Sequence, residues 1–377
     1  GDAGGALRLM EALHMFWPFV SSPKPRRFER LAAVLALPYD SDDRTVLLNR
    51  AWACHRAGQL IMKEPAQARE WFEESLRHFH VLGHGAGEAT ALLNLMEASV
   101  MGSDLDAAEA YGDRARVVVR RIDDRPAEAW MLFTDAMLAL ACGQPDRAAA
   151  RAREARDVFE ERGAGYGVYS AYGIFSSLCV LGEAHYAQGR YADAVAAYGE
   201  AVSIQGRTGF VRDVEDLLED LAIVAAALAA HERAAELLGA AATWRAIDAD
   251  PRVPYGMADY QAATAASRRS LGLRRWQAAF DAGTRLTSGQ AMALANATVD
   301  DLAARVSATA VGLTARERQV LSLIADGSHD AEVAERLQLS RRTVQAHLRS
   351  VYAKLNVTTR TAAVHRAQEL DLIRPVA

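Results

Sequence analysis

One stretch of the sequence carries small residues at the spacing that two closely packed antiparallel helices require. Gly182 lies in the first apolar segment of this stretch, Gly189 interrupts it, and Ala194, Tyr198 and Ala201 follow at helical intervals. Two helices approach closely only where Gly or Ala removes bulk, and an aromatic side chain then fills the space toward the next pair. The pattern predicts a helix, a turn at Gly189 and a second helix that folds back on the first.

Weaker copies of this spacing predict a series of such helix pairs. The unit resembles the tetratricopeptide repeat, which implies an all-α, right-handed superhelix whose concave face contacts a partner or inducer. Tyr166, Tyr169 and Tyr172 fall near one junction between repeats, and we interpret Cys54 as a small packing residue rather than a reactive thiol. The residues of the four further copies are Ala51, Cys54, Gly58, Ala68 and Phe72; Gly102, Leu105, Ala108 and Ala115; Ala136, Ala139, Gly143, Ala148, Ala152 and Ala155; and Ala222, Ala226, Ala234, Leu238 and Ala241.

The regular spacing ends at a loop that contains Pro251 and Pro254. Helical patterns resume at 260–271, 274–282 and 288–306, and we interpret them as a cap that covers the apolar face of the last repeat. The sequence thus predicts three parts, which are a helical-repeat domain with its cap at 1–306, a linker at 307–311 and a separate C-terminal domain at 312–377.

Charge is distributed unevenly between these parts. The whole chain of 377 residues has a net charge of −5, but residues 312–377 contain ten Lys and Arg against seven Asp and Glu. No carboxylate occurs between Glu335 and Glu369, whereas seven basic residues do. An acidic body with a small basic end is typical of a nucleic-acid-binding module on a larger scaffold.

Other features favour an intracellular protein without catalytic chemistry. The three cysteines are far apart, no CxxC pair occurs, and no leader or membrane-spanning pattern is recognisable, so we expect a cytoplasmic protein with no membrane contact. No Cys or carboxylate nearby completes a metal-binding set with His78, His80 and His84, and we interpret these residues as surface histidines. No nucleophile–base pattern is present, so we expect no enzyme activity, no catalytic residues, no metal and no cofactor.

The C-terminal segment has the pattern of a helix-turn-helix. Thr314 and Glu317 form a capping box that begins a helix near Ala315. A short helix at 331–337 follows, and Ser340 caps a third helix at 341–355. The third helix has one apolar stripe and a basic opposite face, which predicts that it enters the major groove of DNA. The stripe consists of Val344, Leu348, Val351 and Leu355.

This segment closely resembles the LuxR-type DNA-binding domain over nearly all of 312–377. His329 and Asp330 depart from the Ser/Thr and Asn usual in that family, and Asn356 replaces a usual Gly. Asp330 puts a carboxylate near a phosphate position, which argues against a DNA contact there. The matching stretches are Leu313 to Leu321, Glu332-Val333-Ala334, Leu339 to Val344, His347-Leu348, Tyr352 to Leu355, and Arg360.

The resemblance implies a role for individual residues of the third and fourth helices. Gln345, Ala346 and Arg349 would reach base edges, and this agrees with the known pairing of Gln with adenine, Arg with guanine and Ala with the thymine methyl group. The fourth helix, 361–370, would expose a dimer contact made by Ala363, Val364 and Ala367. The implied phosphate contacts are Arg341, Arg342, Thr343 and Lys354.

The body resembles the C-terminal half of the large ATP-binding LuxR-type regulators, through Glu232 to Ala241, Trp276 to Phe280 and Leu286 to Ser288. No G-x-x-x-x-G-K-[ST] stretch is present, so we infer that an NTPase portion is missing from this chain. We expect a bacterial transcription regulator that binds double-stranded promoter DNA as a homodimer. RNA polymerase and a protein or small-molecule effector on the repeats would be its further partners. The alternatives are a scaffold that sequesters another protein and the output half of an NTPase-coupled switch.

Overall fold

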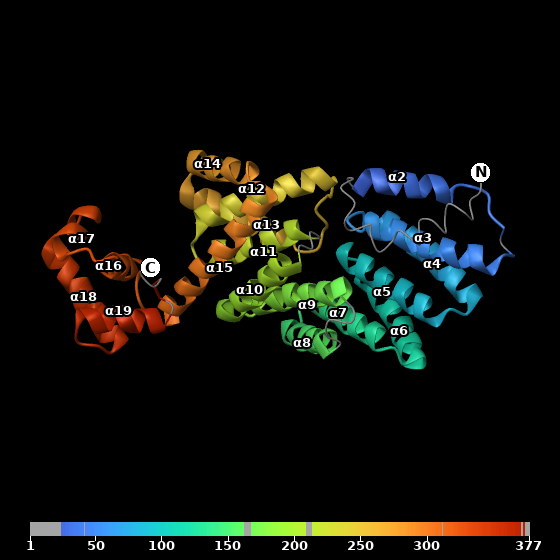
Figure 1. The fold of residues 1–377 in the computed structure, drawn as a ribbon, viewed down its shortest axis with the longest axis horizontal. Coiled ribbons are helices and arrows are strands. Elements are labelled where there is room, and N and C mark those ends of the chain that lie inside the picture. The colour runs from blue at the N-terminus through green and yellow to red at the C-terminus, as the bar shows by residue number, and fades with distance from the viewer. Residues whose placement is uncertain are drawn as a thin grey trace. The chain divides into compact units, whose positions relative to one another are not determined.

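The structure is a computed structural model, and Figure 1 shows its fold. Within the described part of the chain it contains eighteen helices and no strand, which confirms the all-α prediction. None of these helices is long and apolar enough to cross a membrane. The described residues are 24–40, 42–161, 167–208, 213–310, 312–370 and 372–373.

Five successive helix hairpins follow the five predicted copies of the spacing. They begin after α2 (Lys24–Leu35), and in each of them the two helices pack against one another. The helical-repeat body is therefore confirmed. The hairpins are α3 (Arg44–Leu60) with α4 (Pro65–Leu82), α5 (Gly85–Met101) with α6 (Leu105–Ile122), α7 (Arg125–Ala141) with α8 (Pro145–Glu161), α9 (Gly167–Ala187) with α10 (Tyr191–Thr208), and α11 (Val214–Ala227) with α12 (His231–Asp248).

Aromatic rings over glycines explain why the helices of a hairpin can pack so closely. A Cβ atom on Gly182 would lie 2.5 Å from the ring of Tyr198, and one on Gly58 would lie 2.6 Å from the ring of Phe72. Both rings are almost completely buried. Gly189 at the turn has φ +71°, a conformation that residues with a side chain rarely adopt. The predicted turn at Gly189 is confirmed, whereas Tyr198 covers Gly182 within one hairpin rather than filling the space toward the next pair.

Three further helices follow the hairpins, as the sequence predicts, and are α13 (Met257–Leu271), α14 (Leu273–Thr284) and α15 (Ser288–Ala310). Helix α14 crosses α12 where Gly239 meets Gly283. A Cβ on Gly239 would lie 2.0 Å from the Phe280 carbonyl oxygen, so the two backbones are in direct contact. The chain divides into two compact units at 295/296, within α15. The predicted linker falls on the end of α15 and on Val311, which is outside the described residues.

Buried ion pairs connect helices that are distant in sequence within the first unit. Lys63, which follows α3, pairs with Asp216 of α11, and Arg245 of α12 lies 2.6 Å from the same carboxylate. The Tyr255 hydroxyl donates to Glu183 of α9 over 2.6 Å. Of the three tyrosines at the repeat junction, Tyr172 packs its ring 5.8 Å from that of Trp130. Tyr166 and the side chain of Tyr169 are outside the described residues.

Four helices form the described part of the second unit beyond α15. They surround a single apolar core to which every one of them contributes buried side chains. The Thr314–Glu317 capping box is confirmed, since the Glu317 N–H donates to Thr314 Oγ1 over 3.2 Å and the Thr314 N–H donates to Glu317 Oε2 over 2.7 Å. The helices are α16 (Ala315–Ala325), α17 (Asp330–Arg336), α18 (Arg341–Leu355) and α19 (Arg360–Glu369).

Candidate nucleic-acid interface

The apolar stripe of α18 fixes the helix on the core of the domain. Val344, Leu348, Val351 and Leu355 are all buried, and α18 packs against both α16 and α17. Ser340 begins the helix, because its hydroxyl accepts the N–H of Thr343 over 3.1 Å. The preceding turn places Gln338 at φ +52°, which sharply reverses the chain between α17 and α18. Since one face of α18 is buried, the opposite face is presented to solvent in a fixed register.

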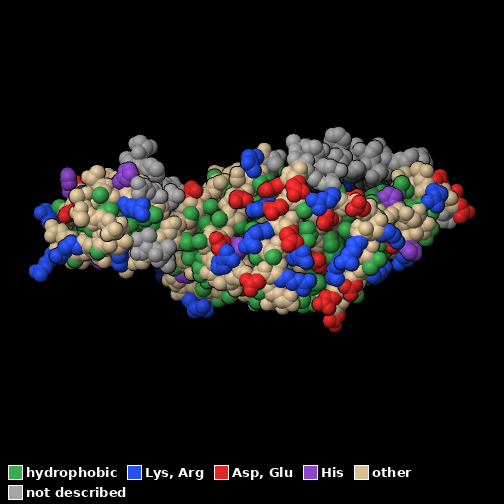
Figure 2. Space-filling model, turned by 90° about the horizontal axis from the view of Figure 1, so that it is seen from below, with side chains coloured by type: hydrophobic (Ala, Val, Ile, Leu, Met, Phe, Trp, Pro, Cys, Tyr) green, Lys and Arg blue, Asp and Glu red, His purple; other side chains and the backbone are tan. Residues whose placement is uncertain are grey.

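Most of the predicted contact residues lie together on this solvent-exposed face of α18. Arg341, Arg342, Gln345, Ala346 and Arg349 are exposed, at intervals of one, four, five and eight residues along the helix. The three arginines form no ion pair with any residue that the structure describes, so their guanidinium groups are available for an external anion. Figure 2 shows one face of the molecule, on which Lys and Arg side chains are visible over both units.

Thr343 lies between the two faces and is half-buried. Its hydroxyl is 2.8 Å from Ser340 Oγ, so it takes part in the capping of α18. If this hydroxyl also bound a phosphate, it would do so while it contacts Ser340 at the start of α18. We did not predict this contact between Thr343 and Ser340 from the sequence. A Ser followed three residues later by a Thr at the start of a helix is the pattern that indicates it.

Lys354 connects two helices of the domain. The family resemblance implies a phosphate contact for Lys354, and in the structure its Nζ atom lies 2.6 Å from Oε2 of Glu317 on α16. Burial opposes ionisation of Glu317, yet hydrogen bonds from Lys354, Ser350 and the Thr314 N–H lower the pKa of this carboxyl to about 2. The ammonium group of Lys354 therefore holds α18 against the first turn of α16. A phosphate contact by Lys354 stays a prediction, and it would have to share this ammonium group with Glu317.

The unusual start of α17 is compensated within the domain. Asp330 Oδ1 is 2.9 Å from Nη1 of Arg360, the first residue of α19, and Arg360 also donates to the Ser328 carbonyl. The N–H of His329 donates to Glu332 Oε2 over 2.8 Å, which is the half of a capping box that the third residue of the helix supplies. Because Arg360 neutralises Asp330, the carboxylate that the sequence analysis noted presents less negative charge to an approaching phosphate.

Three residues of the fourth helix were predicted to form an exposed dimer contact, and this prediction is wrong for two of them. Ala363 and Ala367 of α19 are completely buried in the core of their own domain, and Val364 is half-buried against that core. The small side chains let α19 approach α16 and α18, so the i, i+4 alanine spacing reflects packing within one chain. Ala363 and Ala367 thus offer no surface to a second copy.

Comparison with known proteins identifies the family of the C-terminal segment and finds relatives of a larger part of the chain. Residues 311–367 match the family described as "Bacterial regulatory proteins, luxR family". Two proteins that each bear the name "Putative HTH-type transcriptional regulator", Mb0914c of Mycobacterium bovis and Rv0890c of Mycobacterium tuberculosis, are 31% identical to this chain over 271 residues. The similarity covers 72% of this chain and 29% of each relative, so the chain spans less than a third of their length.

Proposed function

Because residues 311–367 belong to the luxR family of bacterial regulatory proteins, we propose that this chain binds double-stranded promoter DNA and regulates transcription. The observation that carries the proposal is the face of α18 opposite its buried stripe. Three arginines without an internal ion-pair partner among the described residues and one exposed Gln lie on it within three helical turns. A helix with this face fits the major groove, where Arg and Gln read base edges.

The exposed residues divide into two groups by their position along α18. Gln345, Ala346 and Arg349 form the middle of the exposed face, which reaches deepest into a groove, and we assign them to base contacts. Arg341 and Arg342 lie at the first turn, next to the positive end of the helix, where a phosphate is favourably bound. The first group would carry sequence preference, and the second would carry affinity that depends on salt.

The other partners are part of the same proposal. A homodimer on an inverted repeat would use a surface other than the buried Ala363 and Ala367. RNA polymerase and a protein or small-molecule effector on the helical repeats would complete the regulatory circuit, in the cytoplasm. An NTPase portion coupled to this chain stays a prediction, and the chain spans less than a third of the length of the two mycobacterial relatives.

Selection of duplexes from a random library tests the proposal against the scaffold alternative. The full chain is immobilised, bound duplexes are recovered over several rounds, and the enriched sequences are compared with those of the Gln345→Ala/Arg349→Ala double variant. We expect the parent chain to enrich one motif, in two inverted copies if a dimer binds, and the variant to enrich none. A parent chain that enriches no motif would contradict a sequence-specific regulator and favour a scaffold.

A further inference from the structure

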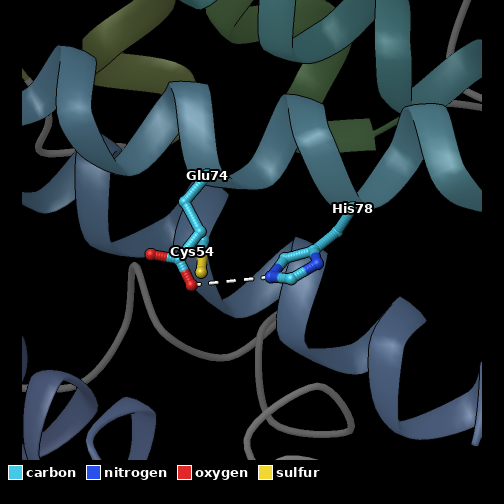
Figure 3. Close-up of side chains that lie close together, drawn as sticks. All are labelled: Cys54, Glu74 and His78. Atoms are coloured by element: carbon cyan, nitrogen blue, oxygen red, sulfur yellow. Dashed lines mark ion pairs between the residues drawn. The ribbon is translucent and has the colours of Figure 1, made fainter. Parts of the chain in front are cut away.

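Three side chains with metal-ligating atoms meet in the first hairpin, on helices α3 and α4. Cys54 comes from α3, and Glu74 and His78 come from α4 (Figure 3). One ligating atom from each residue, Sγ, a carboxylate oxygen and an imidazole nitrogen, lies within 4.8 Å of the other two. The sequence around His78 alone does not indicate a metal site, because no Cys or carboxylate completes a set there. The hairpin brings Cys54 to it from twenty-four positions away, and α4 brings Glu74 from one turn earlier.

The separation of these atoms fits a tetrahedral metal centre. Glu74 and His78 are four residues apart on one helix face, and Glu74 Oε1 lies 3.5 Å from His78 Nε2. Two ligands bound at about 2.0–2.1 Å to a tetrahedral zinc ion are about 3.3 Å apart, so this pair is already spaced for chelation. Sγ of Cys54 lies within 4.8 Å of both other ligand atoms. A zinc–sulfur bond of about 2.3 Å would draw it closer to them as the third corner.

The surroundings of the three residues also suit a metal centre. Cys54 is completely buried. His78 Nε2 is a buried atom that makes no hydrogen bond with the described residues, and Glu74 Oε1 lies 3.5 Å from it. Burial lowers the pKa of His78, which keeps the imidazole neutral as a ligand must be. Burial also raises the pKa of the Cys54 thiol, so a metal would have to displace its proton.

Arg50 of α3 orients the carboxylate of the group. Its Nη1 donates to the Leu35 carbonyl over 2.7 Å, and its Nη2 lies 3.0 Å from Glu74 Oε1. The guanidinium also stacks on the ring of Tyr39, whose edge faces His78. An anchored partner of this kind fixes the direction of a ligating carboxylate, as outer-shell residues do around metal ions. The positive charge of Arg50 disfavours a cation that carboxylate oxygen alone would hold. The thiolate of Cys54 is therefore the ligand that decides which metal ion binds.

We propose that the α3–α4 hairpin binds one divalent transition metal ion of the zinc class through Cys54 Sγ, the Glu74 carboxylate and His78 Nε2. The set of one sulfur, one nitrogen and one oxygen favours such ions over Mg²⁺ and Ca²⁺, which prefer oxygen ligands. Three protein ligands leave the fourth tetrahedral position for water or an external ligand. Binding would join α3 to α4 at the N-terminal end of the described helical repeats. This proposal is independent of DNA binding.

Titration with Co²⁺, which takes the place of zinc and reports on its ligands, tests the site directly. The full chain is treated with a chelator, dialysed and titrated with CoCl₂, and the near-ultraviolet band of thiolate-to-cobalt charge transfer is recorded. We expect one Co²⁺ per chain, with a band that Cys54→Ser abolishes. The variants His78→Gln and Glu74→Gln remove partly exposed ligands and should also lose stoichiometric binding.

Two matched variants control for non-specific binding. Cys142→Ser removes another thiol, and His80→Gln removes an exposed imidazole on the same helix that pairs with Glu88. Both should bind Co²⁺ as the parent chain does. Circular dichroism with and without ZnCl₂ provides a second readout, in which the melting temperature rises for the parent and controls but not for His78→Gln. Absence of the band at one equivalent of Co²⁺, or its persistence in Cys54→Ser or His78→Gln, would overturn the proposal.

Discussion

Among single residues, Glu317 shows how a buried carboxylate can hold helix α18 in place. It accepts the N–H of Thr314 on its own helix and the ammonium of Lys354 on α18. Glu317→Gln should lower the stability of the C-terminal domain by about 1–3 kcal/mol, because charge-assisted hydrogen bonds are lost. Hydrogen exchange followed by mass spectrometry on peptides of α16 and α18 would measure this, with the exposed Glu335→Gln as control.

The contribution of Glu317 to stability should depend on pH. Since the folded state lowers the pKa of Glu317 from 4.5 to about 2, its contribution to stability is complete above about pH 4.5 and is lost as the pH falls toward 2. The difference in hydrogen exchange between the parent chain and Glu317→Gln should therefore shrink from pH 6 to pH 3. A difference that stays constant over this range would contradict the assigned ion pair.

The residues that sequence reasoning found and missed differ in how their contacts arise. Gly182 and Tyr198 belong to one hairpin, so spacing along two successive helices predicts their contact. The exposed face of α18 follows in the same way from the period of its apolar stripe. The pairs Lys354–Glu317 and Asp330–Arg360 join different helices of a folded domain, and no periodicity encodes which charged side chains will meet. Burial of Ala363 and Ala367 was missed because small side chains suit both a core and an interface.

At the scale of helices, the crossing of α12 and α14 depends on two glycines. A Cβ on Gly239 would lie 2.0 Å from a backbone oxygen of α14, so Gly239→Ala forces the helices apart. We expect a loss of about 1–3 kcal/mol in the free energy of unfolding, measured by urea denaturation. Gly206→Ala is the matched control, because Gly206 is an exposed helical residue with nothing within 4 Å of the added Cβ.

The control variant Gly206→Ala should be as stable as the parent chain or more stable by about 0.4–1 kcal/mol. Alanine restricts the unfolded chain and favours the helical conformation. Equal stability of Gly239→Ala and the parent chain would show that α12 and α14 are not in backbone contact. The sequence predicted helices after the proline-containing loop but could not indicate this contact, because the two glycines are forty-four positions apart and no repeat relates them.

At the scale of the whole molecule, buried carboxylates should make the stability of the helical-repeat unit depend on pH. Burial, together with the charges of Asp216 and Asp259, raises the pKa of Glu183 to about 7. The folded state thus holds this proton to a higher pH than the unfolded chain does. The resulting stability is complete below about pH 4.5 and is lost as the pH rises through about 7.

The variant Glu183→Gln has no carboxyl to titrate, and its amide oxygen can still accept a hydrogen bond from the Tyr255 hydroxyl. The melting temperature of Glu183→Gln relative to the parent chain should therefore increase between pH 5.5 and pH 8. The exposed Glu70→Gln serves as the control and should differ from the parent by the same amount at both pH values. A constant difference for Glu183→Gln would show that this carboxylate is ionised throughout the range.

Binding titrations at several salt concentrations would show whether α18 reads base edges. Fluorescence anisotropy would compare the parent chain, Arg349→Ala and Arg342→Ala on the selected duplex and on a scrambled duplex. Arg349→Ala should lose about 1–3 kcal/mol on the selected duplex alone. Arg342→Ala should weaken both complexes and reduce the slope of log K against log salt by about one. Equal losses on both duplexes for Arg349→Ala, with sequence preference intact, would contradict the account.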